Sequence, residues 1–204
     1  SVNVFENLTK GDSDKYEYVI PSYDFNKETF IDNNFFDTFN FKSTGSMRKY
    51  NTNVDELNII NDFLFTSDSL NQKNNIETDF NLLFRNINTY GDLSNTYKED
   101  ENYKFISSAL LNLKYPLIKQ NDSGKKYLTP IASIRYSPNK GDNLQNTETI
   151  ISFQDLFKVD RINRKTVENG EAATLGLEFR NLNNLNKEKL NIGMAINFRN
   201  KEDD

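Results

Sequence analysis

Apolar and polar residues alternate along much of this chain, and the clearest case is segment 103–117. One set of alternate positions is largely apolar and holds Tyr103, Phe105, Ser107, Ala109, Leu111, Leu113, Tyr115 and Leu117. The other set carries Lys104, Ser108, Asn112 and Lys114, with Ile106, Leu110 and Ile118 as apolar exceptions. Because successive side chains of a strand point to opposite faces, this pattern predicts a long β-strand with one apolar and one polar face.

The same alternation recurs in segments 76–90, 128–137, 173–180 and 189–198. Weaker strands are predicted near residues 1–8, 15–25, 34–43, 54–66 and 147–154. Clusters of Gly, Asn, Asp and Ser favour turns, and they occupy residues 10–13, 43–46, 121–124 and 139–142. We therefore expect an all-β protein of about nine or ten antiparallel strands in up-and-down order. No internal domain boundary is expected within residues 1–204.

The predicted strands are long. Several run for about ten to fifteen residues, whereas strands in soluble proteins average about five or six. From Tyr103 to Tyr115 the chain covers about 40 Å, which a tilt of about 40° reduces to about 30 Å across a bilayer. Outer-membrane barrels have an apolar band about 25 Å tall with aromatic residues at both rims. The pattern thus favours a transmembrane β-barrel with lipid outside and a wet lumen inside.

Composition limits the chemistry of the chain. It has no Cys and no His, so it lacks disulfides, thiolate ligands, the commonest general base and the commonest metal ligand. Its net charge of -5 disfavours nucleic acid as a partner. The paired carboxylates Glu77-Asp79 and Glu99-Glu101 come without any sign of a pocket. We expect no enzyme activity, no catalytic residues, no cofactor and no metal.

Neither a signal peptide nor an apolar stretch long enough for a transmembrane helix occurs, and the first residue is Ser1 rather than Met. The chain is therefore expected to be a mature or excised piece of a protein. Pro21 and Pro116 lack the amide hydrogen that a sheet requires, and we expect them to mark strand ends or bulges.

A series of short motifs appears in a fixed order between residues 127 and 198. These are Tyr127-Leu128-Thr129-Pro130, Arg135-Tyr136-Ser137-Pro138, Asp155-Leu156-Phe157, Asp160-Arg161-Ile162, Glu168-Asn169-Gly170, Thr174-Leu175-Gly176-Leu177 and Leu190-Asn191-Ile192-Gly193-Met194. Upstream lie residues 16–25, with an internal Pro21, and Tyr115-Pro116-Leu117-Ile118. In their order and spacing these motifs resemble the barrel of the outer-membrane lipopolysaccharide-assembly proteins (the LptD family).

The resemblance implies an interior portion of a larger barrel in the cell outer membrane. The family's barrel places lipopolysaccharide in the outer leaflet by passage through its lumen and a lateral seam. Implied partners are lipopolysaccharide, outer-membrane lipids, an LptE-like lipoprotein plug in the lumen, and the periplasmic lipopolysaccharide-transport bridge. The bridge would be reached through a jellyroll domain that is absent from these residues.

Two sets of charged residues are candidate sites. Asp160, Arg161 and Glu168 lie in the long loop between two predicted strands, where they could contact lipid phosphates or form an ion-pair network that orders the loop. Arg85, Arg135, Glu178 and Arg180 lie on polar strand faces, where they could line the lumen. The simpler interpretations are the ion-pair network for the loop and a solvated barrel wall for the strands.

Two other classes fit the same alternation. One is another outer-membrane barrel, such as a nutrient transporter or a porin. The other is a soluble extracellular β-protein that binds glycans, in which Tyr and Phe would stack on sugars. A soluble protein would pack its apolar faces together, whereas a barrel would leave them outside.

Overall fold

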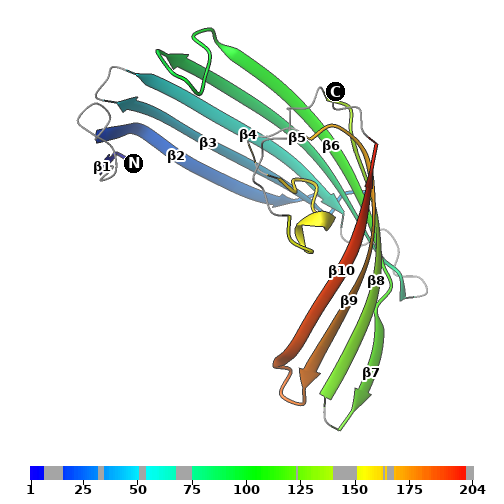
Figure 1. Cartoon of the computed structure of the whole chain (residues 1–204). Helices are drawn as coiled ribbons and strands as arrows, with labels where there is room; N and C mark the ends of the chain where they lie inside the picture. Colours follow the sequence, from blue (N-terminus) through cyan, green and yellow to red (C-terminus); the bar gives the residue numbers. More distant parts are fainter. Residues whose placement is uncertain are drawn as a thin grey trace. The chain divides into compact units, whose positions relative to one another are not determined.

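A computed structural model describes residues 1–6, 16–31, 35–50, 54–67, 75–122, 124–139, 151–162, 164 and 168–200. Within these residues the chain forms ten strands and one short 3-10 turn (Figure 1). They are β1 (Asn3–Glu6), β2 (Tyr16–Phe30), β3 (Thr38–Tyr50), β4 (Asp55–Ser67), β5 (Glu77–Asp92), β6 (Asn102–Lys114), β7 (Leu117–Asn121), β8 (Gly124–Ser137), η2 (Asp155–Phe157), β9 (Gly170–Asn183) and β10 (Glu188–Arg199).

All ten strands belong to one antiparallel sheet. Their order in the sheet is β1-β2-β3-β4-β5-β6-β8-β9-β10, and β7 pairs with β8. The prediction of an all-β chain in up-and-down order is thereby confirmed. In the part of the chain described, the sheet is not closed, because β1 pairs only with β2 and β10 only with β9.

The strands β6 and β7 together form one arm of a hairpin with β8. Lys114 pairs with Ile131 and Leu117 with Leu128, so the register is the same on both sides of the break. The amide of Tyr115 donates to the carbonyl of Pro130 at 3.1 Å, whereas Pro116 has no amide hydrogen to donate. The predicted continuous strand over 103–117 is thus interrupted at Pro116, which marks a strand end as expected.

Two local predictions were wrong. Residues 43–46 were expected to form a turn, but they lie inside β3. Gly45 lies beneath the ring of Tyr23, where a Cβ would clash, so this glycine allows close approach within the sheet. Residues 151–154 were expected to end a strand, but they lead into η2. The remainder of that predicted strand, 147–150, lies outside the described residues, as do the predicted turn at 10–13 and most of the one at 139–142.

Polar side chains are buried on one face of these strands, and apolar side chains are exposed on the other face. On β8 the polar Ser133 and Arg135 are 4% and 6% exposed, whereas the apolar Ile134 and Tyr136 between and beside them are 64% and 50% exposed. On β6 Ser108 and Asn112 are buried, whereas Phe105 is largely exposed. We call the side of the sheet that carries Ser133 and Arg135 the inner face and the opposite side the outer face.

By its internal contacts the chain divides into two compact units. The first unit comprises residues 1–30, 39–64 and 84–106, and the second comprises residues 31–38, 65–83 and 107–204. This burial pattern occurs in both. In the first unit Asp62 and Arg85 are buried on the inner face, whereas Phe63 and Phe105 remain exposed on the outer face.

Candidate functional site

A loop segment covers the inner face of the second unit. We call its described residues, 151–162, 164 and 168–169, the inner loop (η2 is yellow in Figure 1). The Asn112 side chain on β6 donates to the carbonyl of Phe157 at 3.0 Å, and Arg135 Nε on β8 donates to the carbonyl of Val159 at 3.1 Å. These buried polar groups replace water as hydrogen-bond partners for the loop backbone. The loop is therefore held by the polar inner face.

The turn η2 carries its own short-range stabilisation. Lys158 Nζ donates to Asp155 Oδ1 at 2.8 Å, and the Ser152 hydroxyl donates to Asp155 Oδ2 at 2.5 Å. These hydrogen bonds from Lys158 and Ser152 lower the pKa of Asp155 to about 2. The carboxylate thus remains ionised at any physiological pH.

Two phenylalanine rings of the inner loop lie against two glycines of the sheet. A Cβ on Gly176 of β9 would be 2.5 Å from Phe157 Cζ, and a Cβ on Gly193 of β10 would be 2.5 Å from Phe153 Cγ. The two rings also contact each other edge to face, with centroids 5.3 Å apart. Because any side chain at either glycine would occupy the place of a ring, the glycines form a seat for the loop.

Replacing Gly193 with alanine is expected to lift Phe153 from this seat. Overfilling a packed contact costs about 1–3 kcal/mol, so the loop should be cleaved faster by trypsin at Lys158, whose side chain is 59% exposed. The measurement is the rate of limited proteolysis. The double variant Gly193→Ala, Phe153→Ala restores the space, and cleavage equal in all three proteins would contradict the seat.

An ion-pair network surrounds the carboxylate of Glu168 at the end of the inner loop. Arg161 Nε donates to Glu168 Oε2 at 2.7 Å, and Arg161 Nη2 donates to Oε1. Arg135 Nη1 lies 3.4 Å from Oε2, and Arg199 Nε lies 3.4 Å from Oε1. The residues reach this carboxylate from β8, β10 and the loop itself, so the network ties three parts of the chain together.

The network is buried and nearly balanced in charge. Arg161 and Glu168 are 5% and 6% exposed. Burial alone would raise the pKa of Glu168, but hydrogen bonds from Arg161 and the charges of Arg135, Arg161 and Arg199 outweigh it and lower that pKa. The negative charge of Asp160 also attracts the guanidinium group of Arg135. Three guanidinium groups and two carboxylates leave one formal positive charge.

Polar side chains of the strands extend this network. Arg161 Nη1 donates to Asn197 Oδ1 at 3.1 Å, and the Thr174 hydroxyl donates to the same oxygen at 2.9 Å. Arg135 Nη2 donates to the Ser108 hydroxyl at 3.3 Å. These contacts fix the direction of both guanidinium groups, so the arginines are oriented by the sheet as well as by Glu168.

In the first unit a second buried ion pair joins two neighbouring strands. Arg85 Nε on β5 donates to Asp62 Oδ1 on β4 at 2.6 Å, and Arg85 Nη2 donates to Oδ2 at 3.2 Å. The side chains are 4% and 11% exposed. This bidentate geometry suits guanidinium and carboxylate well, and it places Arg85 on the inner wall.

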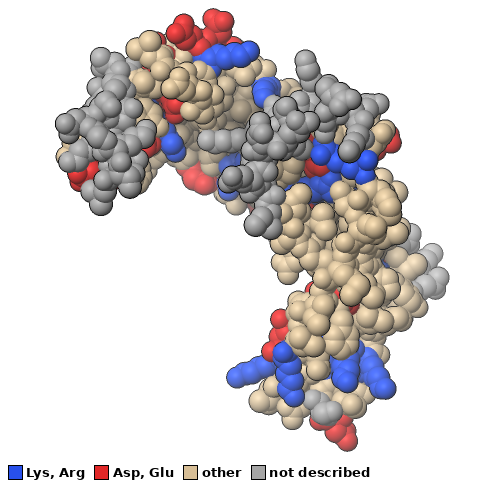
Figure 2. Space-filling view, viewed as in Figure 1, with Lys and Arg blue, Asp and Glu red and all other residues tan. Residues whose placement is uncertain are grey.

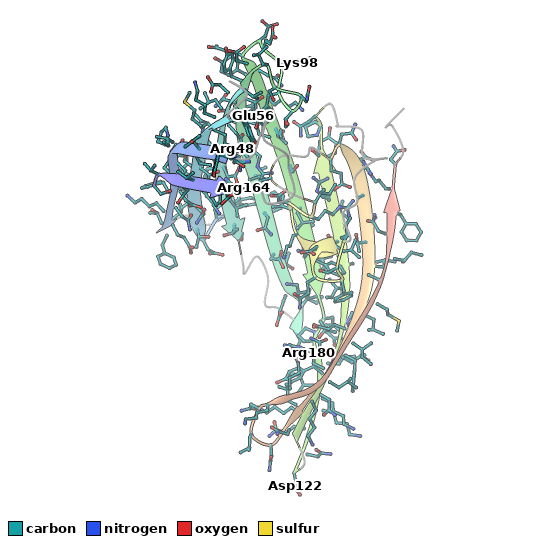
Figure 3. The ribbon with its side chains drawn as sticks, turned by 60° about the vertical axis from the view of Figure 1, so that its left-hand side comes forward. Arg48, Glu56, Lys98, Asp122, Arg164 and Arg180 are labelled. Atoms are coloured by element: carbon teal, nitrogen blue, oxygen red, sulfur yellow. The ribbon has the colours of Figure 1, made fainter. Side chains whose placement is uncertain are left out.

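The two remaining candidates lie together on the inner face near the other end of the second unit (Arg180 is labelled in Figure 3). Arg180 Nε is 3.7 Å from Glu178 Oε2, and its guanidinium carbon lies 5.3 Å from the ring centre of Tyr127. The Arg180 side chain is 41% exposed. The charged groups of this pair are more exposed to solvent than those of the Glu168 network, and its ion-pair distance is longer.

The structure thus brings Arg135 into one network with Arg161 and Glu168, although the sequence pattern places them in separate sets. It leaves Arg85 and the Glu178–Arg180 pair in other places. The partners Asp62, Asn197 and Arg199 were not predicted from the sequence. Asp62 is a charged residue among apolar ones in segment 54–66, which could have indicated it, whereas nothing in the sequence indicated Arg199.

No protein-family model matches the chain, and none of the curated proteins matches it. In the described part of the chain, no group of three or more acidic residues could hold a metal ion. None of the helical segments described there has the length and apolar character needed to span a bilayer.

Proposed function

We propose that this chain forms part of the wall of an outer-membrane β-barrel that places lipopolysaccharide in the outer leaflet. The observation that carries the proposal is this burial pattern. Ile134, Leu175 and Met194 are 64%, 54% and 64% exposed on the outer face, while arginines and glutamate are buried on the inner face. A strand between lipid and a polar lumen needs this arrangement, whereas a soluble β-protein would cover its apolar face.

The outer face of β10 supports the same proposal. Its apolar residues are Leu190, Ile192, Met194, Ile196 and Phe198, each between 44% and 64% exposed. Eight residue steps at about 3.3 Å give about 26 Å along the strand, close to the apolar band of a barrel. Charged Lys187, Glu188 and Lys189 precede this band in the chain, as expected where a strand leaves the hydrocarbon.

The lipopolysaccharide part of the proposal rests on the order of motifs between residues 127 and 198. The positions of these motifs in the fold support it. Asp155-Leu156-Phe157 and Asp160-Arg161-Ile162 belong to the inner loop, and Gly176 and Gly193 form its seat. The sugar head would pass along the polar inner face with the inner loop as its lid, and no bond would be made or broken.

Adjacent residues of β10 offer a direct test of the membrane part. Ile192 and Asn191 are both exposed but lie on the outer and inner faces, respectively. Because the chain has no Cys, each can be replaced by a single cysteine and labelled with a fluorophore. In vesicles of brominated phospholipid we expect strong quenching at position 192 and little at 191. Equal, weak quenching at both would exclude a bilayer-spanning sheet.

The lipopolysaccharide part needs a separate readout. A photo-reactive amino acid at position 191 should crosslink to lipopolysaccharide in cells, and the same group at position 119 on exposed β7 is the control. If position 192 lies in the bilayer but no such crosslink forms, the membrane part of the proposal remains supported, and the barrel transports a different substrate. Ion conductance in a planar bilayer would then support a porin or transporter.

A further inference from the structure

A groove opens on the outer face of the first unit, away from the networks described above. Its volume is 360 Å³, which is at the lower end of the range of about 300–1,000 Å³ typical of small-molecule sites. The residues that line it come from β4, β5 and the start of β6, and they include Leu57, Ile59, Asn88, Tyr90, Glu101 and Tyr103. The groove therefore combines aliphatic, aromatic and acidic walls.

The polar groups of the groove are mainly acceptors. The Tyr103 hydroxyl donates to Glu101 Oε2, which fixes the carboxylate beside the ring. Asn88 Nδ2 donates to Asn86 Oδ1 at 2.7 Å, which leaves the Asn88 oxygen as an acceptor. Among the described residues that line the groove there is no Lys or Arg. A phosphate or carboxylate ligand would thus meet a like charge and find no cation.

The surroundings of the groove are acidic. The end of β5 and the connection to β6 carry four exposed carboxylates and one exposed lysine. They are Asp92, Glu99, Asp100 and Glu101, and Lys98. Figure 2 shows acidic side chains gathered at this end of β5 and β6, and Lys98 is labelled there in Figure 3. Charges of one sign near a concave site raise the local concentration of the opposite ion. The field at the groove therefore favours a cation.

We propose that this groove binds an organic ammonium group on a small apolar body. The faces of aromatic rings attract ammonium groups, and the recognition of quaternary ammonium ligands is a well-established use of this attraction. Tyr90 and Tyr103 supply the rings, Glu101 supplies the opposite charge, and Leu57 and Ile59 contact the apolar part. The ammonium group can come from a free solute such as choline or from the headgroup of a lipid.

The first experiment titrates the full-length protein with choline in a maltoside detergent and measures binding by calorimetry. The matched ligand is 3,3-dimethyl-1-butanol, which has the shape of choline without its charge. We expect choline to bind at least about tenfold more tightly than the neutral alcohol. Equal affinities for choline and the neutral alcohol would overturn the proposal, because the groove would then recognise only the apolar part of the ligand and not its charge.

Variants then test the named residues. Glu101→Gln removes the groove carboxylate, and Glu99→Gln removes an exposed charge two residues away that does not line the groove. We expect about a tenfold loss of choline affinity for Glu101→Gln and less than about twofold for Glu99→Gln. Tyr103→Leu should lose more affinity than Tyr103→Phe. If the two glutamate changes lowered choline affinity equally, the proposed site would be contradicted. Binding would then depend on the overall negative charge of this region and not on Glu101 in the groove.

The source of the ammonium group is decided by lipid retention. The protein is purified from mixed phosphatidylethanolamine and phosphatidylglycerol, and bound lipid is measured by native mass spectrometry. Retention of phosphatidylethanolamine that depends on Glu101 identifies a lipid headgroup, whereas choline binding without it identifies a free solute. Failure of both overturns the proposal. Because calorimetry in detergent needs no bilayer, that result is independent of whether the chain spans a membrane.

Discussion

Replacing Glu168 with glutamine is expected to lower the free energy of unfolding by about 3–5 kcal/mol, because breaking a buried ion pair leaves its partners uncompensated. Arg161, Arg135 and Arg199 all lie within hydrogen-bond or ion-pair distance of this carboxylate. Glutamine keeps the shape of the side chain but brings amide hydrogens toward guanidinium groups. The measurement is urea unfolding in buffered detergent, followed by circular dichroism.

The matched control is Glu171→Gln, which removes an exposed carboxylate three residues away. It should change the free energy of unfolding by less than about 1 kcal/mol. The inner loop of the Glu168→Gln variant should also be cleaved faster at Lys158, since Arg161 lies within that loop. Equal stability of the two variants would show that the network contributes little to the fold.

The same carboxylate gives a pH dependence of defined sign. The pKa of Glu168 is lowered in the folded protein, and a free glutamate titrates near about 4.3. The contribution of the Glu168 carboxylate to the free energy of unfolding is therefore complete above the pKa of a free glutamate. It is lost as the pH falls through the lower pKa of the folded protein. The stability difference between the wild type and Glu168→Gln should accordingly narrow in acid. A difference that stayed constant below about pH 4 would assign the effect to shape rather than charge.

Replacing Arg85 with methionine has the second large expected effect, a loss of about 3–5 kcal/mol from the free energy of unfolding. Asp62 would lose the bidentate contact that Arg85 makes with it among buried side chains. The measurement is again urea unfolding. Asp62→Leu combined with Arg85→Met removes both charges and should recover most of the stability.

The control for Arg85 is Arg180→Met. Arg180 is 41% exposed and lies 3.7 Å from Glu178, and exposed pairs contribute about 0–1 kcal/mol. If Arg180→Met lowered the free energy of unfolding as much as Arg85→Met, burial would not explain the difference expected between these two ion pairs. If the double variant stays as unstable as Arg85→Met, packing by the Arg85 side chain is the main contribution.

Much of the fold could be predicted from the sequence. The segments 76–90 and 189–198 became β5 and β10 with shifts of only a few residues at their ends, since a period of two is visible without any partner. At the turn predicted over 121–124, the described residues Asn121 and Gly124 are paired. The turn predicted at residues 43–46 was wrong, because these residues lie inside β3 and Gly45 lies against the ring of Tyr23, a contact that a local turn propensity does not contain.

The candidate site was less predictable. The loop residues Arg161 and Glu168 are seven positions apart, close enough for a loop interaction to be considered. Arg135 and Glu168 are 33 positions apart, and Asp62 and Arg85 are 23 apart. Such pairs depend on the register between strands and on the path of the loop, and a single sequence fixes neither.

The sequence by itself determined where most of the strands lie, their up-and-down order and the two chemically different faces of each strand, because these follow from local periodicity and turn residues. Only the tertiary structure decided which face is covered. The inner loop lies on the polar face, and that placement buries Arg135 and Ser133 while Ile134 stays exposed. Which face is covered depends on contacts between residues far apart in the chain, such as the contact of Phe153 with Gly193. A local sequence pattern does not contain such contacts.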